Sequence, residues 1–594
     1  MKITTCVDEN SPWFAKYWPE TVPKQLTYDD SLTMYDILQR NADENPDYKA
    51  IWFLDTWVTY KQLKDMVDKF SSGLERLGAK KGDVLALILP NCIQYVVAYY
   101  AAVKLGVITT GVNPTYKPGE VLHQLKLTGA RYAVILDMLN DSLLAPIRNK
   151  LDLKEVVSTN LVDLASGMSP IKKILGKMLG RIPTGNVPDS LEFSKMLRRK
   201  SPDSARADID QENDPAAYIM TGGTTGEPKA AVLTHRNIYA NALQVNSWVL
   251  NQPTPEFEMP GPKGAVVGVL PLFHSFGMTC VMNSALMVKA WMMLFPKPPA
   301  TEDLLKTFEK LDISNGMIYP GAEILFQRIT DFPVLGQYKA GLEKLFCCVS
   351  GAGPLHRHTQ DRFELLTETP IVEGYGLTET GPVVSVGNFI GDERCTGTIG
   401  LPLPGTEWKI FPVMDFDAGP VSEFGEQEGM GEICVSGPQV MKGYLKQPEE
   451  TAATIRVWGE RQWLLTGDLG YMDEFGRIVI RDRKKQLIKM KGYSIYPKEV
   501  EELIGAHPDV KEVAVAGIPD PETGEFVKAW VKVDQGSSLT PVGLREWCRE
   551  NMTHYKVPKE VEFMNEIPKN LIGKVMRRTL QEMDPRFRKA RGIQ

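Results

Sequence analysis

The stretch AYIMTGGTTGEPKAAVLTHRN, residues 217–237, contains a glycine- and threonine-rich loop followed by a lysine. Loops of this composition often bind phosphate, and the Walker A loop is the first candidate to test. In a Walker A loop the lysine directly follows a glycine and a helix begins there. Here Pro228 precedes Lys229, and the next residues, AAVLTH, predict a strand, with a helix only from about Arg236. The loop therefore joins two predicted strands and is not a Walker A loop.

The loop nevertheless carries groups that bind an anion. Its glycines let successive backbone N–H groups turn toward one point, its threonines add hydroxyl donors, and its lysine adds a positive charge. The candidate phosphate-binding residues are Thr221, Gly222, Gly223, Thr224, Thr225, Gly226 and Lys229. An ordinary hairpin loop has a similar composition, so the rest of the sequence has to distinguish the two interpretations.

Length and composition indicate a globular protein with more than one domain. A chain of 594 residues is longer than one hydrophobic core supports. Its 43% hydrophobic and 24% charged residues are ordinary for such proteins, and a net charge of −6 gives no basic signature for nucleic-acid binding. Eight cysteines without a C-x-x-C pair predict neither a disulfide framework nor a zinc site.

No segment predicts export or a membrane span. The N-terminal residues MKITTCVDENSPW lack the apolar run of a signal peptide, so a cytoplasmic location is expected. The longest uncharged run, residues 264–288, is interrupted by Pro271, His274 and Asn283. A buried strand, a loop and a core helix are expected there instead.

Predicted strands and helices alternate through most of the chain. DVLALILP predicts a buried strand, NCIQYVVAYYAAVKLG a helix ended by Gly106, and VITTGVNP a second strand. This alternation predicts an α/β fold with helix-covered mixed sheets, followed after about Ile410 by a small β-subdomain. We expect a large N-terminal domain, residues 1–482, and a small α+β C-terminal domain, residues 483–594, with a hinge near Lys485.

Five further segments carry candidate nucleotide-binding residues: LPLFHSFGM at 270–278, SGAGPL at 350–355, EGYGLTET at 373–380, TGDLGYMDEFGRIVIRDRKKQLIKMKGY at 466–493 and PKNLIGKVMRR at 568–578. Each alone is a weak signal. Together with the loop at 221–229, they resemble the adenylate-forming (AMP-binding) superfamily of acyl-CoA ligases, luciferases and peptide-synthetase adenylation domains. The acyl-CoA synthetase branch is favoured. The chain departs from the usual motifs at Gly222, Ala230 and Ile572, where serine, glycine and serine or threonine are common.

The resemblance implies an adenosine site in the N-terminal domain. Tyr375 would pack on the adenine, next to Gly376 and to a turn formed by Gly351, Ala352 and Gly353. Asp468 would bind the ribose diol, since a carboxylate can accept two hydroxyl bonds, and Arg483 would assist there.

The resemblance also implies the reacting groups. Thr378 would bond the α-phosphate of ATP, Glu379 would help to hold Mg²⁺, and His274 would lie near the acyl and phosphate groups. Lys574 would be the adenylation lysine. A carboxylate that attacks the α-phosphate is repelled by its negative charge, so the site would act by positioning, and Mg²⁺ and Lys574 would cancel the charge.

The second half-reaction would use another face of the C-terminal domain. By resemblance, this mobile domain rotates about Lys485 after acyl-AMP has formed. Lys489, Lys491, Gly492 and Tyr493 would then line the tunnel for coenzyme A, whose thiol attacks the acyl-AMP. The expected substrates and cofactors are therefore a small carboxylic acid, ATP, Mg²⁺ and coenzyme A.

One segment bears on the identity of the acid. In SPIKKILGKMLGRIP, residues 169–183, apolar side chains from Ile171 to Ile182 fall on one helical face and basic side chains on the other. Ser169 suits an N-cap, and Pro183 a stop. Such a helix lies on an anionic membrane, here at its inner face, or packs on the protein, and the sequence leaves both open.

The expected acyl-pocket segments, 274–282, 319–326 and 350–353, contain no arginine or lysine to pair with a second carboxylate. A medium- or long-chain fatty acid is the first expectation. A cyclic or aromatic acid is the alternative, and the sequence leaves the direction of that reaction open, including the ATP-forming one. A luciferase-like monooxygenase and a non-catalytic fatty-acid-binding or transport protein remain as further readings, because a fold does not fix a function.

Overall fold

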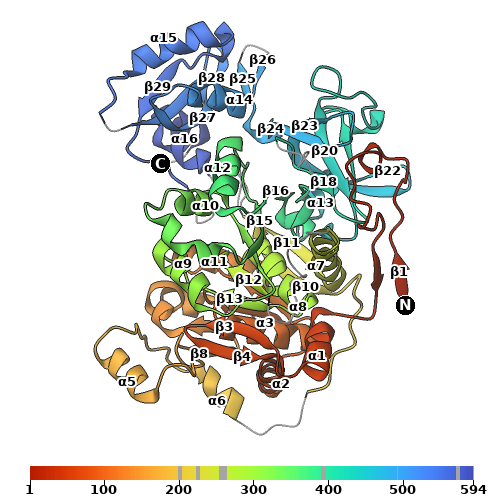
Figure 1. Ribbon diagram of the computed structural model, residues 1–594, viewed down its shortest axis with the longest axis vertical. Helices are drawn as coiled ribbons and strands as arrows, with labels where there is room; N and C mark the ends of the chain where they lie inside the picture. The colour runs from red at the N-terminus through yellow and green to blue at the C-terminus, as the bar shows by residue number, and fades with distance from the viewer. Residues whose placement is uncertain are drawn as a thin grey trace. The chain divides into compact units, whose positions relative to one another are not determined.

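The computed structural model describes residues 1–198, 204–221, 228–252, 264–389, 397–490, 493–534, 536–569 and 575–592 (Figure 1). The chain forms two compact units, and each is described by itself. The first comprises Met1–Gly222, Pro228–Glu407 and Ser436–Arg456, and the second comprises Trp408–Val435 and Val457–Gln594.

An eight-stranded sheet of the first unit contains the two strands that flank the glycine-rich loop. Its order is β21-β11-β10-β6-β5-β7-β8-β9; the strands from β10 to β9 are parallel, and β11 and β21 are added antiparallel. The strands are β5 Val84–Ile88, β6 Ile108–Gly111, β7 Tyr132–Leu136, β8 Glu155–Thr159, β9 Leu191–Glu192, β10 Pro215–Thr221, β11 Lys229–Thr234 and β21 Gly443–Tyr444. The predicted pair of strands around the loop is confirmed.

A nine-stranded sheet forms the other half of this unit, in the order β18-β17-β16-β15-β14-β12-β13-β3-β4. Its strands from β16 to β3 are parallel, and antiparallel strands extend both ends. The strands are β3 Lys49–Phe53, β4 Thr56–Thr59, β12 Ala265–Gly268, β13 Trp291–Leu294, β14 Met317–Gly321, β15 Leu345–Ser350, β16 Ile371–Gly376, β17 Val383–Val386 and β18 Leu401–Pro402. The strands β1 Lys2–Thr4 and β2 Thr27–Asp29 pair separately.

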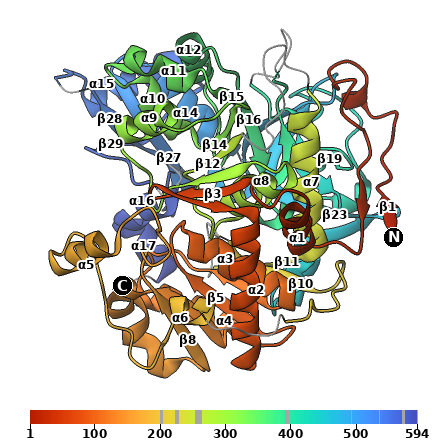
Figure 2. The same cartoon turned by 60° about the horizontal axis from the view of Figure 1, so that its bottom comes forward.

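Helices accompany both sheets, which confirms the expected α/β fold (Figures 1 and 2). They are α1 Met34–Glu44, α2 Tyr60–Arg76, α3 Ile93–Leu105, α4 Pro118–Thr128, α6 Phe193–Arg198, α7 His235–Leu250, α8 Ser284–Met287, α9 Thr301–Lys310, α10 Glu323–Thr330, α11 Lys339–Leu342, α12 Arg357–Thr367 and α13 Pro448–Thr454. Every residue of α3 is buried, as expected for a helix that is apolar all round, and Gly106 ends it in the left-handed conformation.

The long uncharged run forms a strand, a loop and buried helical turns. β12 is followed by a π-helical segment, Gly277–Asn283, and by α8, and nearly all of these side chains are buried. Among the described residues, no helix is long and apolar enough to cross a membrane.

The amphipathic segment forms helix α5, Pro170–Met178, which projects at the edge of the first unit in both views (Figures 1 and 2). The Ser169 hydroxyl caps it by accepting from the N–H of Lys172 at 3.3 Å, as expected. The helix ends at Met178 and does not continue to Pro183. The chain turns back at Gly180, which has φ +65°, and Ile182 packs against Gly176.

The second unit holds two smaller sheets. One has the order β19-β20-β23-β22, with β24 paired to β23; the strands are β19 Glu407–Phe411, β20 Gly431–Ser436, β22 Ile455–Trp458, β23 Arg461–Met472 and β24 Ile478–Arg483. The other has the order β26-β25-β28-β27, with β29 paired to β28; the strands are β25 Ile488–Met490, β26 Tyr493–Ile495, β27 Val510–Asp520, β28 Gly524–Val533 and β29 Glu560–Phe563. The helices α14 Pro497–Gly505, α15 Pro541–Asn551, α16 Arg577–Met583 and α17 Pro585–Arg591 accompany this second sheet.

Candidate functional site

The glycine-rich loop leaves β10 at Thr221 and rejoins the sheet at Lys229, the first residue of β11. Thr221 is buried at the end of its strand. The loop residues Gly222, Gly223, Thr224, Thr225 and Gly226 lie outside the described residues. The ammonium of Lys229 forms an ion pair with Glu450 of α13 and lies 5.0 Å from the ring centre of Tyr444.

A tight turn follows β16 and carries Thr378 and Glu379. The turn is a 3-10 helix, Thr378–Thr380, in which the Thr380 hydroxyl bonds both the N–H and the carbonyl of Leu377 at 3.0 Å. Gly376 has no room for a side chain, since a Cβ there would lie 2.0 Å from the carbonyl oxygen of Pro382. This turn contacts both β10 and β11, so Thr378 and Glu379 lie near the ends of the glycine-rich loop.

Glu379 is held by a tyrosine that the sequence interpretation missed. The Tyr444 hydroxyl donates to Glu379 Oε1 at 2.7 Å, and the N–H of Met441 donates to the Glu379 carbonyl at 2.8 Å. Burial, and then the negative charge of Glu379, raise the pKa of Tyr444 well above its ordinary value, so its hydroxyl stays protonated and donates. β21 has only two residues, too few for a period of hydrophobicity to reveal it.

The donor set suits a magnesium ion that is shared with phosphate. Among the described residues, no group of three histidine, cysteine or carboxylate side chains gathers as a metal cage, and no hydrogen bond reaches the second carboxylate oxygen of Glu379. Mg²⁺ usually binds through one or two carboxylates, substrate phosphates and several waters. One oriented carboxylate near the ends of the expected phosphate loop, Thr221 and Lys229, fits that coordination.

The expected adenine turn follows β15, next to the strand that carries Tyr375. β15 and β16 pair in parallel, with Ser350 opposite Glu373. Ala352 has φ +69°, a left-handed conformation that is uncommon for a residue with a side chain. A Cβ at Gly351 would lie 2.8 Å from the ring of Phe276, and Gly353 has open space. Tyr375 is half-buried and Gly376 is exposed.

His274 lies in the loop after β12, where its Nδ1 accepts from the N–H of Phe276 at 3.3 Å and its side chain is half-buried. Four large side chains of the expected acyl segments are strongly buried: Met278, Met282, Tyr319 and Phe326 have at most 1% exposure. Their only carboxylate, Glu323, is engaged by His356 at 2.8 Å.

In the second unit the two expected ribose residues meet. Asp468 on β23 and Arg483 on β24 are opposite each other in an antiparallel pair, and Arg483 Nε lies 2.8 Å from Asp468 Oδ1. Asp468 is 2% exposed, so its charge needs this partner. The next residue, Lys484, pairs with Glu432 at 2.8 Å.

The expected hinge, Lys485, lies in a 3-10 turn, Lys484–Gln486, that links β24 to β25. Lys489 is exposed on β25, and its N–H donates to Glu525 at 2.8 Å. Tyr493 begins β26. Lys491, Gly492 and Lys574 lie outside the described residues. The boundary expected at residues 482 and 483 lies inside the second unit, at the end of β24.

Comparison with known proteins identifies the family of the chain. The family described as AMP-binding enzyme matches residues 38–445, and the AMP-binding enzyme C-terminal domain matches residues 499–574. Two curated relatives are long-chain-fatty-acid–CoA ligases. That of Bacillus subtilis is 35% identical over 97% of this chain and 98% of its own length. That of Escherichia coli O6:H1 is 34% identical over 96% and 98%. The crystal structure of ATP-bound MatB from Rhodopseudomonas palustris is 26% identical, with a TM-score of 0.77 over 93% of this chain and 99% of that one.

Proposed function

The chain belongs to the AMP-binding enzyme family, and from that premise we propose that it activates a medium- or long-chain fatty acid. It is an AMP-forming acid–CoA ligase that uses ATP, Mg²⁺ and coenzyme A. The observation that carries the choice of acid is the 35% identity, along almost the whole chain, with a long-chain-fatty-acid–CoA ligase.

The chemistry of the expected acyl segments supports a fatty acid over charged acids. They contain no lysine or arginine, and their one carboxylate is already paired with His356. A second carboxylate or an α-amino group on the substrate would therefore be buried without a partner, which is costly. A hydrocarbon chain needs no such partner.

We assign the following roles on that basis. The loop from Thr221 to Lys229 holds the pyrophosphate portion of ATP, Thr378 bonds the α-phosphate, and Lys574 stabilises the charge that develops as the acid attacks. A magnesium ion at Glu379 would supply further charge neutralisation at the phosphates. Tyr375 and the turn at 351–353 bind adenine, and Asp468 and Arg483 bind the ribose.

In the second half-reaction the C-terminal domain, residues 483–594, turns about Lys485. Lys574 withdraws, and the strand face at Lys489–Tyr493 approaches the acyl-AMP with the thiol of coenzyme A. Closure over the anhydride keeps water out and limits its hydrolysis.

The test is AMP release by the complete protein with MgATP and coenzyme A, over acids from acetate through octanoate and palmitate to benzoate and cyclohexanecarboxylate. We expect the highest kcat/KM on a long chain. A maximum on benzoate or cyclohexanecarboxylate would overturn the fatty-acid proposal in favour of a ring acid. Light emission or oxygen consumption would indicate the luciferase-like alternative, and acid binding without AMP release the transport alternative.

The membrane contact considered for α5 gains support from its exposure. The residues Ile171, Ile174, Leu175, Met178 and Leu179 are between 52% and 79% exposed, so more than half of each is left uncovered by the rest of the protein. Lys172 and Arg181 are exposed beside them. An apolar stripe with basic flanks suits the surface of an anionic bilayer, where long-chain acids also partition.

Vesicle sedimentation tests this contact. The protein should bind phosphatidylglycerol vesicles more tightly than phosphatidylcholine vesicles, and the double variant I171D/L175D should reduce the partition coefficient by about tenfold or more. Leu365→Asp on α12 is the matched control, because Leu365 is 81% exposed and lies outside α5. Equal loss in both variants, or none in the double variant, would refute α5 as the contact.

A further inference from the structure

Tyr444 lies on β21, the two-residue strand that pairs with β11. It pairs with Ala231 of β11, two residues after Lys229, and the backbone bond from the N–H of Leu445 to the carbonyl of Ala230 continues the pair at 2.9 Å. On its other side, the N–H of Tyr444 donates to Thr451 Oγ1 at 2.9 Å. The backbone of Tyr444 is therefore fixed to the same strand that ends the loop.

The side chain of Tyr444 joins two groups that the reaction needs. Its hydroxyl donates to Glu379 Oε1 at 2.7 Å, and its ring faces the Lys229 ammonium at 5.0 Å. The first contact fixes one carboxylate oxygen without adding charge, because a phenol donates a hydrogen bond and stays neutral. In the second contact, the negative face of the Tyr444 ring attracts the Lys229 ammonium.

We propose that Tyr444 is a positioning residue for adenylation, which orients the Glu379 carboxylate toward a divalent cation and holds the Lys229 ammonium at the start of β11. The inference rests on the proposed function of Glu379 and Lys229 and adds a residue to it. A neutral donor is the suitable partner here, because an ammonium on Glu379 would cancel the charge that the cation requires.

The hydroxyl of Tyr444 can be removed without its ring, which separates this role from packing. Tyr444→Phe keeps the ring that faces Lys229 and removes only the hydroxyl. We expect the dissociation constant of Mn²⁺ in the presence of a non-hydrolysable ATP analogue, measured by electron paramagnetic resonance, to rise by about 10–100-fold. The free Mg²⁺ that gives half-maximal ATP–pyrophosphate exchange should rise in parallel, while affinity for the metal-free nucleotide should stay at the wild-type value.

Tyr35→Phe is a closely matched control. The Tyr35 hydroxyl donates to Asp68 at 2.8 Å, and the ammonium of Lys104 lies 5.2 Å from its ring. The same atom is therefore removed from the same kind of contact, at a carboxylate that the proposed chemistry does not use. We expect this variant to bind Mn²⁺ like the wild type.

A second variant tests the ring. Tyr444→Leu removes the hydroxyl and the aromatic face, so affinity for the metal-free nucleotide should also fall, by roughly threefold to tenfold. Wild-type Mn²⁺ affinity in Tyr444→Phe would overturn the proposal, as would an equal weakening in Tyr35→Phe. If no fatty acid supports exchange in the wild type, the proposed choice of acid fails, yet the Mn²⁺ measurement still decides the role of Tyr444.

Discussion

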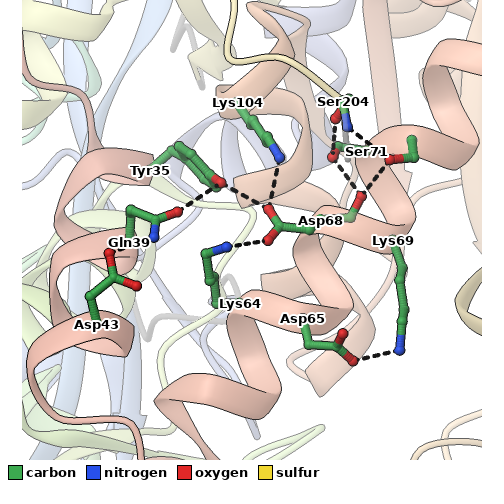
Figure 3. A network of polar contacts seen from close by, with 11 residues as sticks. Tyr35, Gln39, Asp43, Lys64, Asp65, Asp68, Lys69, Ser71, Lys104 and Ser204 are labelled. Atoms are coloured by element: carbon green, nitrogen blue, oxygen red, sulfur yellow. Dashed lines mark hydrogen bonds and ion pairs between the residues drawn. The ribbon is translucent and has the colours of Figure 1, made fainter. Parts of the chain in front are cut away.

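Two carboxylates of the first unit have almost the same tyrosine contact and different remaining partners. Asp68 on α2 and Glu379 after β16 each accept a tyrosine hydroxyl, at 2.8 and 2.7 Å, and each tyrosine ring has a lysine ammonium near its face. Asp68 also accepts hydrogen bonds from the ammonium groups of Lys104, at 2.8 Å, and Lys64, at 2.6 Å (Figure 3). Near Glu379 the lysine, Lys229, pairs with Glu450 instead.

If the proposed role of Glu379 is right, the difference separates a structural charge from one that binds a ligand. Two ammonium groups neutralise Asp68 and occupy both of its oxygens, so the network is complete within the protein (Figure 3). Glu379 is oriented by a neutral hydroxyl, which brings no positive charge to the carboxylate. A single carboxylate in that condition can bind a cation that arrives with phosphate.

The largest effect should come from removing the charge of Glu379. Glu379→Gln keeps the shape and an acceptor for Tyr444, but it cannot neutralise a metal ion. We expect ATP–pyrophosphate exchange to fall by roughly 10²–10³-fold. Asp68→Asn is the counterpart in the other network, and its exchange rate per folded molecule should equal that of the wild type. Comparable losses in both variants would remove the distinction between the two sites.

A smaller effect, on stability, should come from Lys104. This side chain is 2% exposed, and Lys104→Met removes its ammonium while retaining most of its length. We expect the free energy of unfolding to fall by about 1–3 kcal/mol, because the Asp68 carboxylate loses the hydrogen bond that Lys104 donates to it. Urea denaturation measures this.

Lys69→Met on α2 serves as the comparison for that variant. Lys69 pairs with Asp65 at 2.7 Å, but both side chains are exposed (Figure 3). Its loss should change the unfolding free energy by less than about 1 kcal/mol. A cost as large as that of Lys104→Met would mean that burial does not set the strength of these pairs.

The smallest effect should appear in how the free energy of unfolding changes as the pH is lowered. Burial raises the pKa of Asp68, but hydrogen bonds from Lys104, Lys64 and Tyr35 outweigh it and hold the pKa below its ordinary value. The stabilisation is therefore fully present above about pH 4, the ordinary pKa of an aspartate, and is lost as the pH falls through the lower folded-state value. Unfolding curves between pH 6 and pH 3 should show a steeper decline for the wild type than for Asp68→Asn. Parallel curves would contradict this linkage.

Local sequence patterns predicted the helices and strands whose formation is set by residues close together in the chain. Alternation of apolar segments predicted the strands on both sides of the glycine-rich loop, and Ser169 predicted the start of α5. The end of α5 was predicted too late, because Gly180 turns the chain before Pro183. The exposure of the apolar face of α5 depends on the rest of the fold and could not be predicted from its own residues.

The candidate site shows the same division. Asp468 and Arg483 face each other across a hairpin of adjacent strands, and the family resemblance singled out both. Tyr444 lies 65 residues after Glu379, and the two meet because β21 pairs with β11 at the edge of a sheet. Neither residue carries a local signal for that pairing, since sheet order is a property of the whole domain.

The pairing of β21 also makes the site sensitive to a slip of register. Successive side chains on a strand point to opposite faces of the sheet, so a shift of one residue would turn the Tyr444 ring away from Glu379 and Lys229. β21 has only two residues at the sheet edge, and its position relies on Thr451, which bonds Tyr444 and packs where Gly443 has no side chain. A one-residue insertion or deletion between β20 and β21 would therefore act on catalysis through strand alignment, although it adds or removes no reacting group.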